Sequence, residues 1–149
     1  MVIYITYGGV NLTIKTAGKE QVGMLALMTK KLFEDEPSDT VLSIAEFKER
    51  LIKYFDNGCK AYLFIEEDVI GYALVNLSRN PYYIVDFFID RKFRRGGNGT
   101  TALNQLITEL KTDTIDLDVF CWNERGREFW RSLGFTERAI IMRKHIAAE

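Results

Sequence analysis

The chain has 149 residues, 47% of them hydrophobic, and a formal net charge of -1. This length and composition suit a single domain over residues 1–149 with one sizeable core, and the near-neutral charge offers no broad basic field to a nucleic-acid partner. The first residues contain neither a basic leader nor an apolar span of membrane-crossing length, which predicts a cytoplasmic protein with no membrane partner.

Cysteine and histidine are too sparse for several kinds of site. Cys59 and Cys121 form neither a C-x-x-C pair nor a disulfide framework, and His145 is the single histidine, close to the C-terminal end. We therefore expect neither a metal site nor a serine–histidine catalytic triad.

The first third of the chain predicts strand, helix and helix. Residues 1–9 end in two glycines and form either a short edge strand or an appended arm, whereas residues 10–16 alternate apolar and polar side chains and predict a strand with one buried face. Apolar residues at helical spacing predict a helix over about 19–33. A second helix should begin at the capping box Ser43 to Glu46 and stop at Asn57-Gly58.

Sheet structure should take over in the middle of the chain. Residues 61–65 and 70–77 flank acidic turn residues and predict an antiparallel hairpin. Asn80-Pro81 turns the chain into residues 82–89, an apolar and aromatic run that predicts a strand buried on both faces. Asp86 is the one charged residue inside this central strand.

A basic segment and a glycine-rich loop follow the central strand. After Arg91 to Arg95 come Gly96, Gly97, Asn98 and Gly99, and residues 102–110 then repeat apolar side chains at three- and four-residue spacing. The order is strand, glycine loop, helix. Because glycine lets backbone approach a ligand and a helix N-terminus offers unpaired N–H groups, this order favours a phosphate, and we interpret the loop as a pyrophosphate cradle.

The C-terminal part should add two strands and a helix. Residues 115–121 alternate and predict a strand parallel to the central one, since a helix crosses over between them. Asn123 is placed to cap a helix that ends at Gly134-Phe135, and residues 139–142 alternate as a last strand. Cys121 should then pack on the apolar side of its strand rather than carry an acyl group.

Two motifs point to one family. Arg94 to Gly99 fits R-x-x-G-x-G, and the run from Asn123 to Phe135 fits N-x-x-G-x-x-F-W-x-x-x-G-F. Together they resemble the coenzyme A-binding signatures of the GNAT superfamily of N-acetyltransferases, and the resemblance covers roughly residues 10–143. It implies an α/β (α+β) fold with a mixed, mainly antiparallel sheet flanked by helices, and acetyl-CoA as co-substrate.

The resemblance also implies which residues bind the cofactor. In the family the backbone of the central strand pairs with the pantetheine arm, the loop amides hold the pyrophosphate, and an Asn faces the same cofactor. The residues that match are Phe88, Ile89, Arg94, Arg95, Gly96, Gly97, Asn98, Gly99, Thr100, Asn123 and Trp130.

Trp130 departs from the family pattern. The family usually has a Tyr there, which is often credited with protonating the departing thiolate. An indole N–H donates a hydrogen bond but does not exchange a proton near neutral pH. Water, or a tyrosine such as Tyr72, Tyr82 or Tyr83, would have to serve instead.

Asp86 is the candidate general base. Between Ile84 and Phe88 on its own strand face, its carboxylate should lose hydration, which disfavours the ionised form and suits proton abstraction. The same carboxylate would equally serve a salt bridge to an arginine or cap a neighbouring backbone group. Both interpretations stay open from the sequence.

The sequence therefore predicts an acetyl-CoA-dependent N-acetyltransferase that moves acetyl to a primary amine by direct transfer in a ternary complex. The acceptor, a small-molecule or protein amine, is not identified, although the acidic run 34–39 borders the acceptor site in the family and suits a cation. The resemblance is also compatible with a homodimer.

Two other functions fit parts of the sequence. One is a non-catalytic acyl-CoA sensor or interaction module with the same fold, to which the loss of Tyr at Trp130 points. The other is a nicotinamide dinucleotide site, because Gly97-x-Gly99-x-x-Ala102 with Asp116 or Asp118 further on satisfies that fingerprint. Against the second, basic residues separate the glycines from their strand, and too few residues remain for a doubly wound sheet.

Overall fold

A five-stranded sheet forms the centre of the larger of two compact units, Met1–Asp118 and Val119–Glu149. The computed structural model describes residues 12–36, 39–94 and 96–147. The expectations for residues 1–9, and for the start of the strand predicted over 10–16, lie outside the described residues, as does Arg95. The expectation of a single domain stays a prediction.

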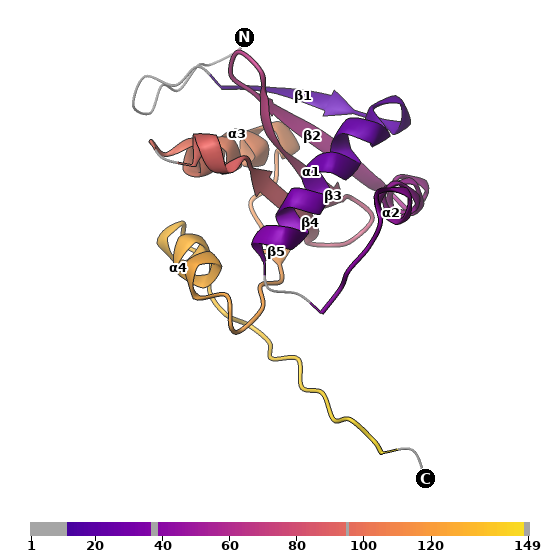
Figure 1. Ribbon diagram of the computed structural model, residues 1–149. Helices are drawn as coiled ribbons and strands as arrows, with labels where there is room; N and C mark the ends of the chain where they lie inside the picture. Colours follow the sequence, from indigo (N-terminus) through magenta and orange to yellow (C-terminus); the bar gives the residue numbers. More distant parts are fainter. Residues whose placement is uncertain (1–11, 37–38, 95, 148–149) are drawn as a thin grey trace. The chain divides into compact units, whose positions relative to one another are not determined.

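The sheet is mixed and mainly antiparallel, as predicted. Its strands lie in sequence order, with antiparallel pairing between the first four and parallel pairing between the last two (Figure 1). The strands are β1 (Thr13–Ala17), β2 (Cys59–Ile65), β3 (Val69–Asn76), β4 (Tyr82–Ile89) and β5 (Ile115–Leu117). The central strand was predicted over residues 82–89, and β4 has these bounds.

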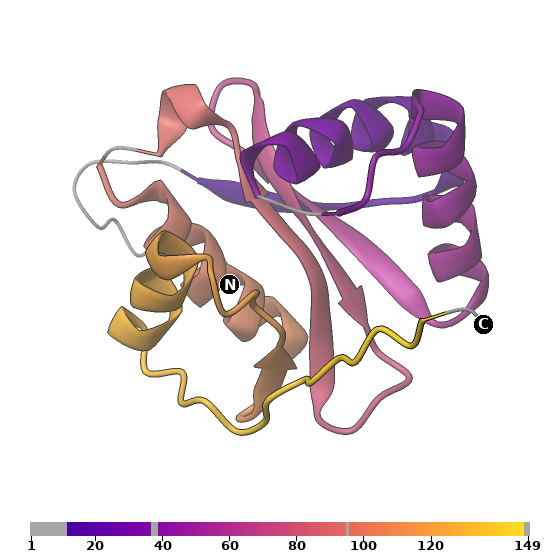
Figure 2. The ribbon, with the colours of Figure 1, turned by 60° about the horizontal axis from the view of Figure 1, so that its bottom comes forward.

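Helices cover both faces of this sheet. A 3-10 turn (Lys19–Gln21) leads into α1 (Val22–Asp35), and α1 and α2 (Ile44–Asp56) lie on one face while α3 (Asn98–Leu110) lies on the other (Figure 2). The predicted capping box starts α2: Ser43 Oγ accepts from the Glu46 N–H at 3.2 Å, and Glu46 Oε1 accepts from the Ser43 N–H at 3.1 Å.

Each face of the sheet has its own apolar layer. On the α1 and α2 side the buried residues recur at helical spacing and meet inward-facing strand residues; they include Leu25, Leu32, Phe47, Leu51, Tyr72, Leu74 and Phe88. On the other side, α3 buries Ala102, Leu103 and Leu106. Both faces of β4 are therefore covered, which explains its nearly continuous apolar sequence.

Gly71 marks the tightest approach between two strands. A methyl group on Gly71 of β3 would lie 2.0 Å from the Phe88 carbonyl oxygen and 3.0 Å from the Ile89 Cα. We expect Gly71→Ala to lower the free energy of unfolding by about 1 to 3 kcal/mol, because backbone must shift to admit the new atom. Gly23→Ala in α1, where a methyl group meets nothing within 4 Å, should be neutral or stabilising in the same urea titration. Equal stabilities for the two variants would contradict this prediction.

The described residues of the smaller unit, 119–147, contain one helix, α4 (Glu124–Ser132). The predicted cap is present, since Asn123 Oδ1 accepts from the Gly126 N–H at 3.0 Å. The prediction of a strand up to residue 121 was wrong beyond Leu117: the Asn123 N–H bonds to the Phe120 carbonyl, so the backbone turns there, and Cys121 is exposed rather than packed.

The predicted last strand over 139–142 is also absent from the described residues. No strand is assigned there, and Ile140, Ile141 and Met142 are 87%, 81% and 89% exposed. Alternating apolar residues form a strand only where a neighbouring strand supplies backbone partners. The alternating pattern of residues 139–142 does not by itself provide such a neighbouring strand.

None of the helices described is long and apolar enough to cross a membrane. Among the same residues, no group of three or more His, Cys, Asp or Glu side chains is placed to hold a metal ion.

Candidate functional site

The outer edge of the C-terminal half of β4 has no neighbouring strand among the described residues. Strand β5 pairs only with Tyr82, Tyr83 and Ile84, so from Val85 to Ile89 the outer edge of β4 has no strand partner in the described part of the chain. On the other side, the register between β3 and β4 shifts between Leu74 and Val75, which leaves Val85 as an extra residue of β4. A bulge of this kind bends the strand and commonly lies beside a ligand site.

Backbone N–H and C=O groups alternate in direction along a strand, which decides which of them point to this outer edge. The Asp90 N–H bonds to the Ile70 carbonyl of β3 at 2.7 Å, and the Phe88 carbonyl also faces β3, beside Gly71. Because backbone groups of successive residues point to opposite edges, those of Phe87 and Ile89 face outward. Of the two strand residues expected to pair with a cofactor, Ile89 presents its backbone there, whereas the Phe88 carbonyl points into the sheet.

Arginine side chains bridge the end of β4 to the end of α1. The Nε of Arg94 donates to the Ile89 carbonyl at 2.8 Å, and the guanidinium of Arg94 also bonds to Asp35. Arg91 donates to the other oxygen of the same carboxylate at 2.7 Å. Asp35 therefore binds two arginines, Arg91 and Arg94, beside the end of β4.

The glycine loop ends in a helix terminus without a side-chain cap. Gly96 and Gly97 have φ of 95° and 82°, and a methyl group on either would meet nothing within 4 Å. The first backbone bond into α3 runs from the Thr101 N–H to the Gly97 carbonyl at 3.0 Å. The N–H groups of the three preceding residues have no acceptor within the helix, and Gly97 has no side chain to supply one.

Two buried polar atoms lie at this terminus without a partner among the described residues. Asn98 donates through Nδ2 to the Phe93 carbonyl at 2.7 Å, but its Oδ1 is unpaired, and so is the Oγ1 of Thr101. Both residues are at least 95% buried, and buried polar atoms are nearly always paired. The Thr101 hydroxyl can donate to an anionic oxygen, so the first turn of α3 fits a phosphate group such as the pyrophosphate of coenzyme A, whereas Asn98 Oδ1 accepts only and pairs with a donor.

Asp86 belongs to a buried ion pair. Arg50 of α2 donates to both of its carboxylate oxygens, at 2.8 and 2.9 Å, and the Tyr72 hydroxyl donates to it at 2.9 Å. Thr29 Oγ1 lies 2.7 Å from the same hydroxyl. The guanidinium also lies between the rings of Phe33 and Tyr54, 5.1 and 4.9 Å from their centroids. The sequence left two roles open for Asp86, a general base and a salt bridge to an arginine. The observed geometry is that of a salt bridge to an arginine.

Two of the tyrosines that could serve as proton donors, Tyr72 and Tyr83, have raised pKa values. Tyr72 is fully buried, and burial, followed by the charge of Asp86, raises the pKa of its hydroxyl well above the usual value. Burial and a hydrogen bond with Asp118 also raise the pKa of Tyr83. A tyrosine that holds its proton so firmly is a poor acid, and Tyr72 has no access to a substrate.

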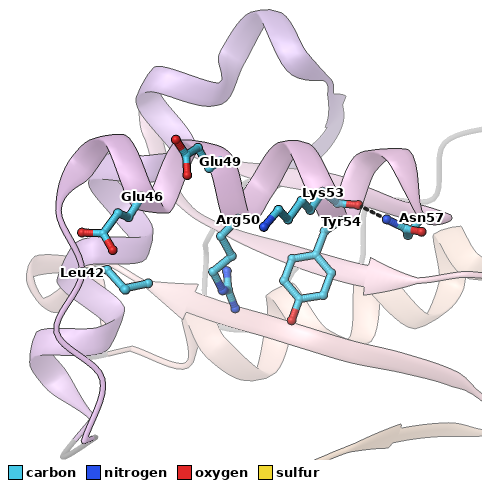
Figure 3. Close-up of a pocket in the computed structure, with 7 residues that line it drawn as sticks. All are labelled: Leu42, Glu46, Glu49, Arg50, Lys53, Tyr54 and Asn57. Atoms are coloured by element: carbon cyan, nitrogen blue, oxygen red, sulfur yellow. Dashed lines mark hydrogen bonds between the residues drawn. The ribbon is translucent and has the colours of Figure 1, made fainter.

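A pocket of about 560 Å³ runs along α2 beside this ion pair. Its lining residues are Leu42, Glu46, Glu49, Arg50, Lys53, Tyr54 and Asn57. Figure 3 shows Arg50 and Tyr54 projecting from the same side of α2, with Leu42 and Glu46 at one end of the pocket. Asp86 neutralises Arg50, so the other charged residues that line the pocket are Glu46, Glu49 and Lys53. Among the described residues, this balance of charge suits a cationic ligand.

Glu36 was not singled out by the sequence. It follows α1 directly and is partly buried. Burial raises the pKa of its carboxyl, the charges of Asp86 and Asp35 raise it further, and Arg94 lowers it. Arg50 was missed as well, since no local pattern connects it to an aspartate 36 residues away.

The predicted cofactor residues divide between the two units. Phe88, Ile89, Arg94 and the loop from Gly96 to Thr100 belong to the larger unit, where the end of β4 and the start of α3 bring them together. Asn123 and Trp130 belong to the smaller unit, in which Asn123 caps α4 and the Trp130 ring packs against Phe129 and Phe135. Their part in cofactor binding stays a prediction.

Comparison with solved structures shows the same fold in several acetyltransferases. A "possible acetyltransferase" from Clostridium difficile 630 superposes with a TM-score of 0.73 at 15% identity, covering 93% of this chain and 99% of that one. A predicted acetyltransferase from Clostridium acetobutylicum, solved with acetyl-CoA, gives 0.70 at 16% identity, covering 91% and 96%. An aminoglycoside acetyltransferase from an uncultured soil metagenomic sample, in complex with sisomicin, gives 0.59 at 18% identity, covering 93% and 97%.

Identities this low establish the fold alone. A comparison with curated proteins found no match. The family model of the Acetyltransferase (GNAT) family, however, matches residues 24–135, which is most of the chain and includes β4, the glycine loop and α4. The chain therefore belongs to the GNAT family of acetyltransferases, whose co-substrate is acetyl-CoA.

Proposed function

We propose that this protein is an N-acetyltransferase that moves acetyl from acetyl-CoA to a primary amine by direct transfer in a ternary complex. The observation that carries the proposal is that the chain leads from the outer edge of β4, which β5 covers only as far as Ile84, to the start of α3, where no side chain caps the helix. Acetyl-CoA supplies the acetyl thioester. Its extended arm lies along the end of β4, and the N–H groups at the start of α3 bind its pyrophosphate.

The acceptor amine binds on the α2 side of the sheet. Support comes from the carboxylates of Glu46 and Glu49, which line the pocket along α2. These groups attract an ammonium ion and hold it next to β4, so that proximity supplies much of the rate. One structural neighbour is an aminoglycoside acetyltransferase in complex with sisomicin, and an aminoglycoside is likewise a cationic amine. Localisation in the cytoplasm and a homodimer stay predictions.

The experiment is a screen of amines with acetyl-CoA, following release of free thiol and the mass of the products. We expect thiol release that depends on the amine and an N-acetylated product. Intact-protein mass spectrometry with acetyl-CoA alone should show no stable acetyl adduct, because direct transfer needs no acyl-enzyme. An adduct that forms and is consumed by amine would replace direct transfer with a two-step route.

Binding should distinguish the alternative functions. Acetyl-CoA and CoA should raise the melting temperature, whereas NAD should not, since a ligand that binds only the folded state stabilises it. A shift with acetyl-CoA but no turnover with any amine would favour the non-catalytic sensor. A shift with NAD alone would refute the acetyl-CoA site.

A further inference from the structure

Asp35 is the last residue of α1, and its partners come from outside that helix. Arg91 donates to one of its carboxylate oxygens at 2.7 Å, and Arg94 donates to the other. The Asp35 side chain is only 18% exposed. A carboxylate at a helix C-terminus opposes the helix dipole, and the last turn of α1 contains no basic residue to offset it. The helix itself is therefore not stabilised by this aspartate, which points to a role in what the two arginines do.

Arg94 connects the Asp35 carboxylate to the outer edge of β4. Its Nε donates to the Ile89 carbonyl at 2.8 Å, and its guanidinium carbon lies 5.9 Å from the centroid of the Phe88 ring. The same side chain thus holds the last residues of β4 and the end of α1 together. A guanidinium can do this because its donors form a planar fork, so that Nε and a terminal nitrogen have different acceptors at once.

The place of Arg94 in the chain gives these contacts their significance. Arg94 lies between the end of β4 and Gly97, the residue that directly precedes α3. In the proposed function the extended arm of acetyl-CoA lies along the end of β4, and its pyrophosphate lies at the start of α3. The contacts of Arg94 therefore fix the chain between the two places where the cofactor binds, and Asp35 holds Arg94.

We propose that Asp35 is a positioning residue for acetyl-CoA. Through Arg94 it fixes the segment between β4 and the glycine loop before the cofactor arrives, so that less conformational entropy is lost on binding. Asp35 acts on cofactor binding and takes no part in acetyl transfer itself. This assignment rests on the acetyl-CoA site of the proposed function.

The negative charge of Asp35 has a second, opposing effect. Acetyl-CoA is an anion, so replacing Asp35 with Asn adds long-range attraction while it releases Arg94. Salt screens the attraction between separated charges, but it does not restore a side chain that has lost its partner. Titrations with acetyl-CoA at low and at high salt therefore separate the two effects.

The test compares Asp35→Asn with Lys31→Gln in calorimetric titration with acetyl-CoA. Lys31 of α1 also forms an ion pair with the end of β4, through Asp90 at 3.2 Å, but neither partner is bonded to Arg94 among the described residues. At high salt, Asp35→Asn should weaken acetyl-CoA binding about 10-fold, as expected for the loss of one charge-assisted hydrogen bond. Lys31→Gln should bind as the wild type does.

Turnover with the best amine from the acceptor screen distinguishes positioning from a merely structural role. Asp35→Asn should raise KM for acetyl-CoA and leave kcat unchanged, because Asp35 acts only on cofactor binding. A purely structural loss would do the reverse, since a smaller folded fraction lowers kcat and leaves KM as it is. A lower kcat with an unchanged KM would therefore overturn the assignment.

Two further variants connect the effect to Arg94. Arg94→Lys keeps the charge but lacks the planar fork that holds Ile89 and Asp35 together, so it should weaken binding by itself. Combining it with Asp35→Asn should cost less affinity than the sum of the single losses. Asp35→Glu keeps the carboxylate and should recover part of the affinity. Additive losses would overturn the assignment, and so would wild-type affinity in Arg94→Lys, a result that stands even if Asp35→Asn does not fold.

Gly97→Glu separates this assignment from the proposed function, because it tests the glycine loop without touching Asp35. If Gly97→Glu weakens acetyl-CoA binding while Asp35→Asn binds as the wild type does at high salt, Asp35 has no positioning role. If both variants bind as the wild type does, the proposed cofactor site fails, and the assignment fails with it.

Discussion

Arg50→Met should lower the free energy of unfolding by about 3 to 5 kcal/mol, the largest loss that we expect from one side-chain change in this protein. The Asp86 side chain is 3% exposed and that of Arg50 is 18% exposed, so the pair is shielded from solvent. Burial acts to lower the pKa of Arg50, but the hydrogen bonds and charge of Asp86 raise it by more. Removing the guanidinium leaves a buried carboxylate with only the Tyr72 hydroxyl to stabilise it.

A double-mutant cycle separates this effect from lost packing, since Arg50 also contacts the rings of Phe33 and Tyr54. Asp86→Asn removes the buried charge and keeps the shape of the side chain. If the ion pair is what matters, the double variant Arg50→Met/Asp86→Asn should be more stable than the sum of the two single changes allows. Additive losses in urea unfolding would assign the cost to packing alone.

The same Asp86→Asn variant decides between the two roles left open for Asp86. A bidentate ion pair with Arg50 positions α2 over β4, so we expect lower stability with the acidic limb of the pH–rate profile intact. A large fall in turnover with an altered acidic limb and unchanged stability would instead make Asp86 the general base.

Local signals explain why much of the fold could be predicted. The bounds of β4 follow from one continuous apolar run, and the start of α2 follows from the reciprocal bonds that Ser43 and Glu46 make over three residues. The start of α3 after the loop follows from glycines that precede residues at helical spacing, whereas phosphate binding by this loop stays a prediction. Each of these features depends on residues that are close in the sequence, so the sequence reveals them without knowledge of the fold.

The features that were missed depend on pairing across the fold. The ion pair between Arg50 and Asp86 joins residues from a helix and a strand, and the outward direction of Phe87 and Ile89 depends on the register with β3 and on the bulge at Val85. Residues 139–142 have the pattern of a strand, but a pattern cannot supply the neighbouring strand that it needs. Sequence periodicity therefore predicted elements better than it predicted their partners.

Gly97→Glu should weaken acetyl-CoA binding by about 100-fold, equivalent to roughly 2.7 kcal/mol, while the protein stays folded. A side chain at this position meets no protein atom within 4 Å, so it would occupy the open space in front of the α3 N-terminus. There it would block the approach of the pyrophosphate and place a negative charge against it.

Two controls isolate the cause. Gly97→Ala has the same backbone strain as Gly97→Glu, since φ at this position is 82°. It adds little bulk and no charge. Its affinity for acetyl-CoA in calorimetric titration should therefore lie between those of the wild type and Gly97→Glu. Gly23→Glu adds the same charge in α1, at a position that is also open, and should bind acetyl-CoA as the wild type does. Wild-type affinity in Gly97→Glu would remove the glycine loop from the cofactor site. Equal losses in Gly97→Ala and Gly97→Glu would show that the shape of the backbone, rather than access to the helix terminus, governs binding.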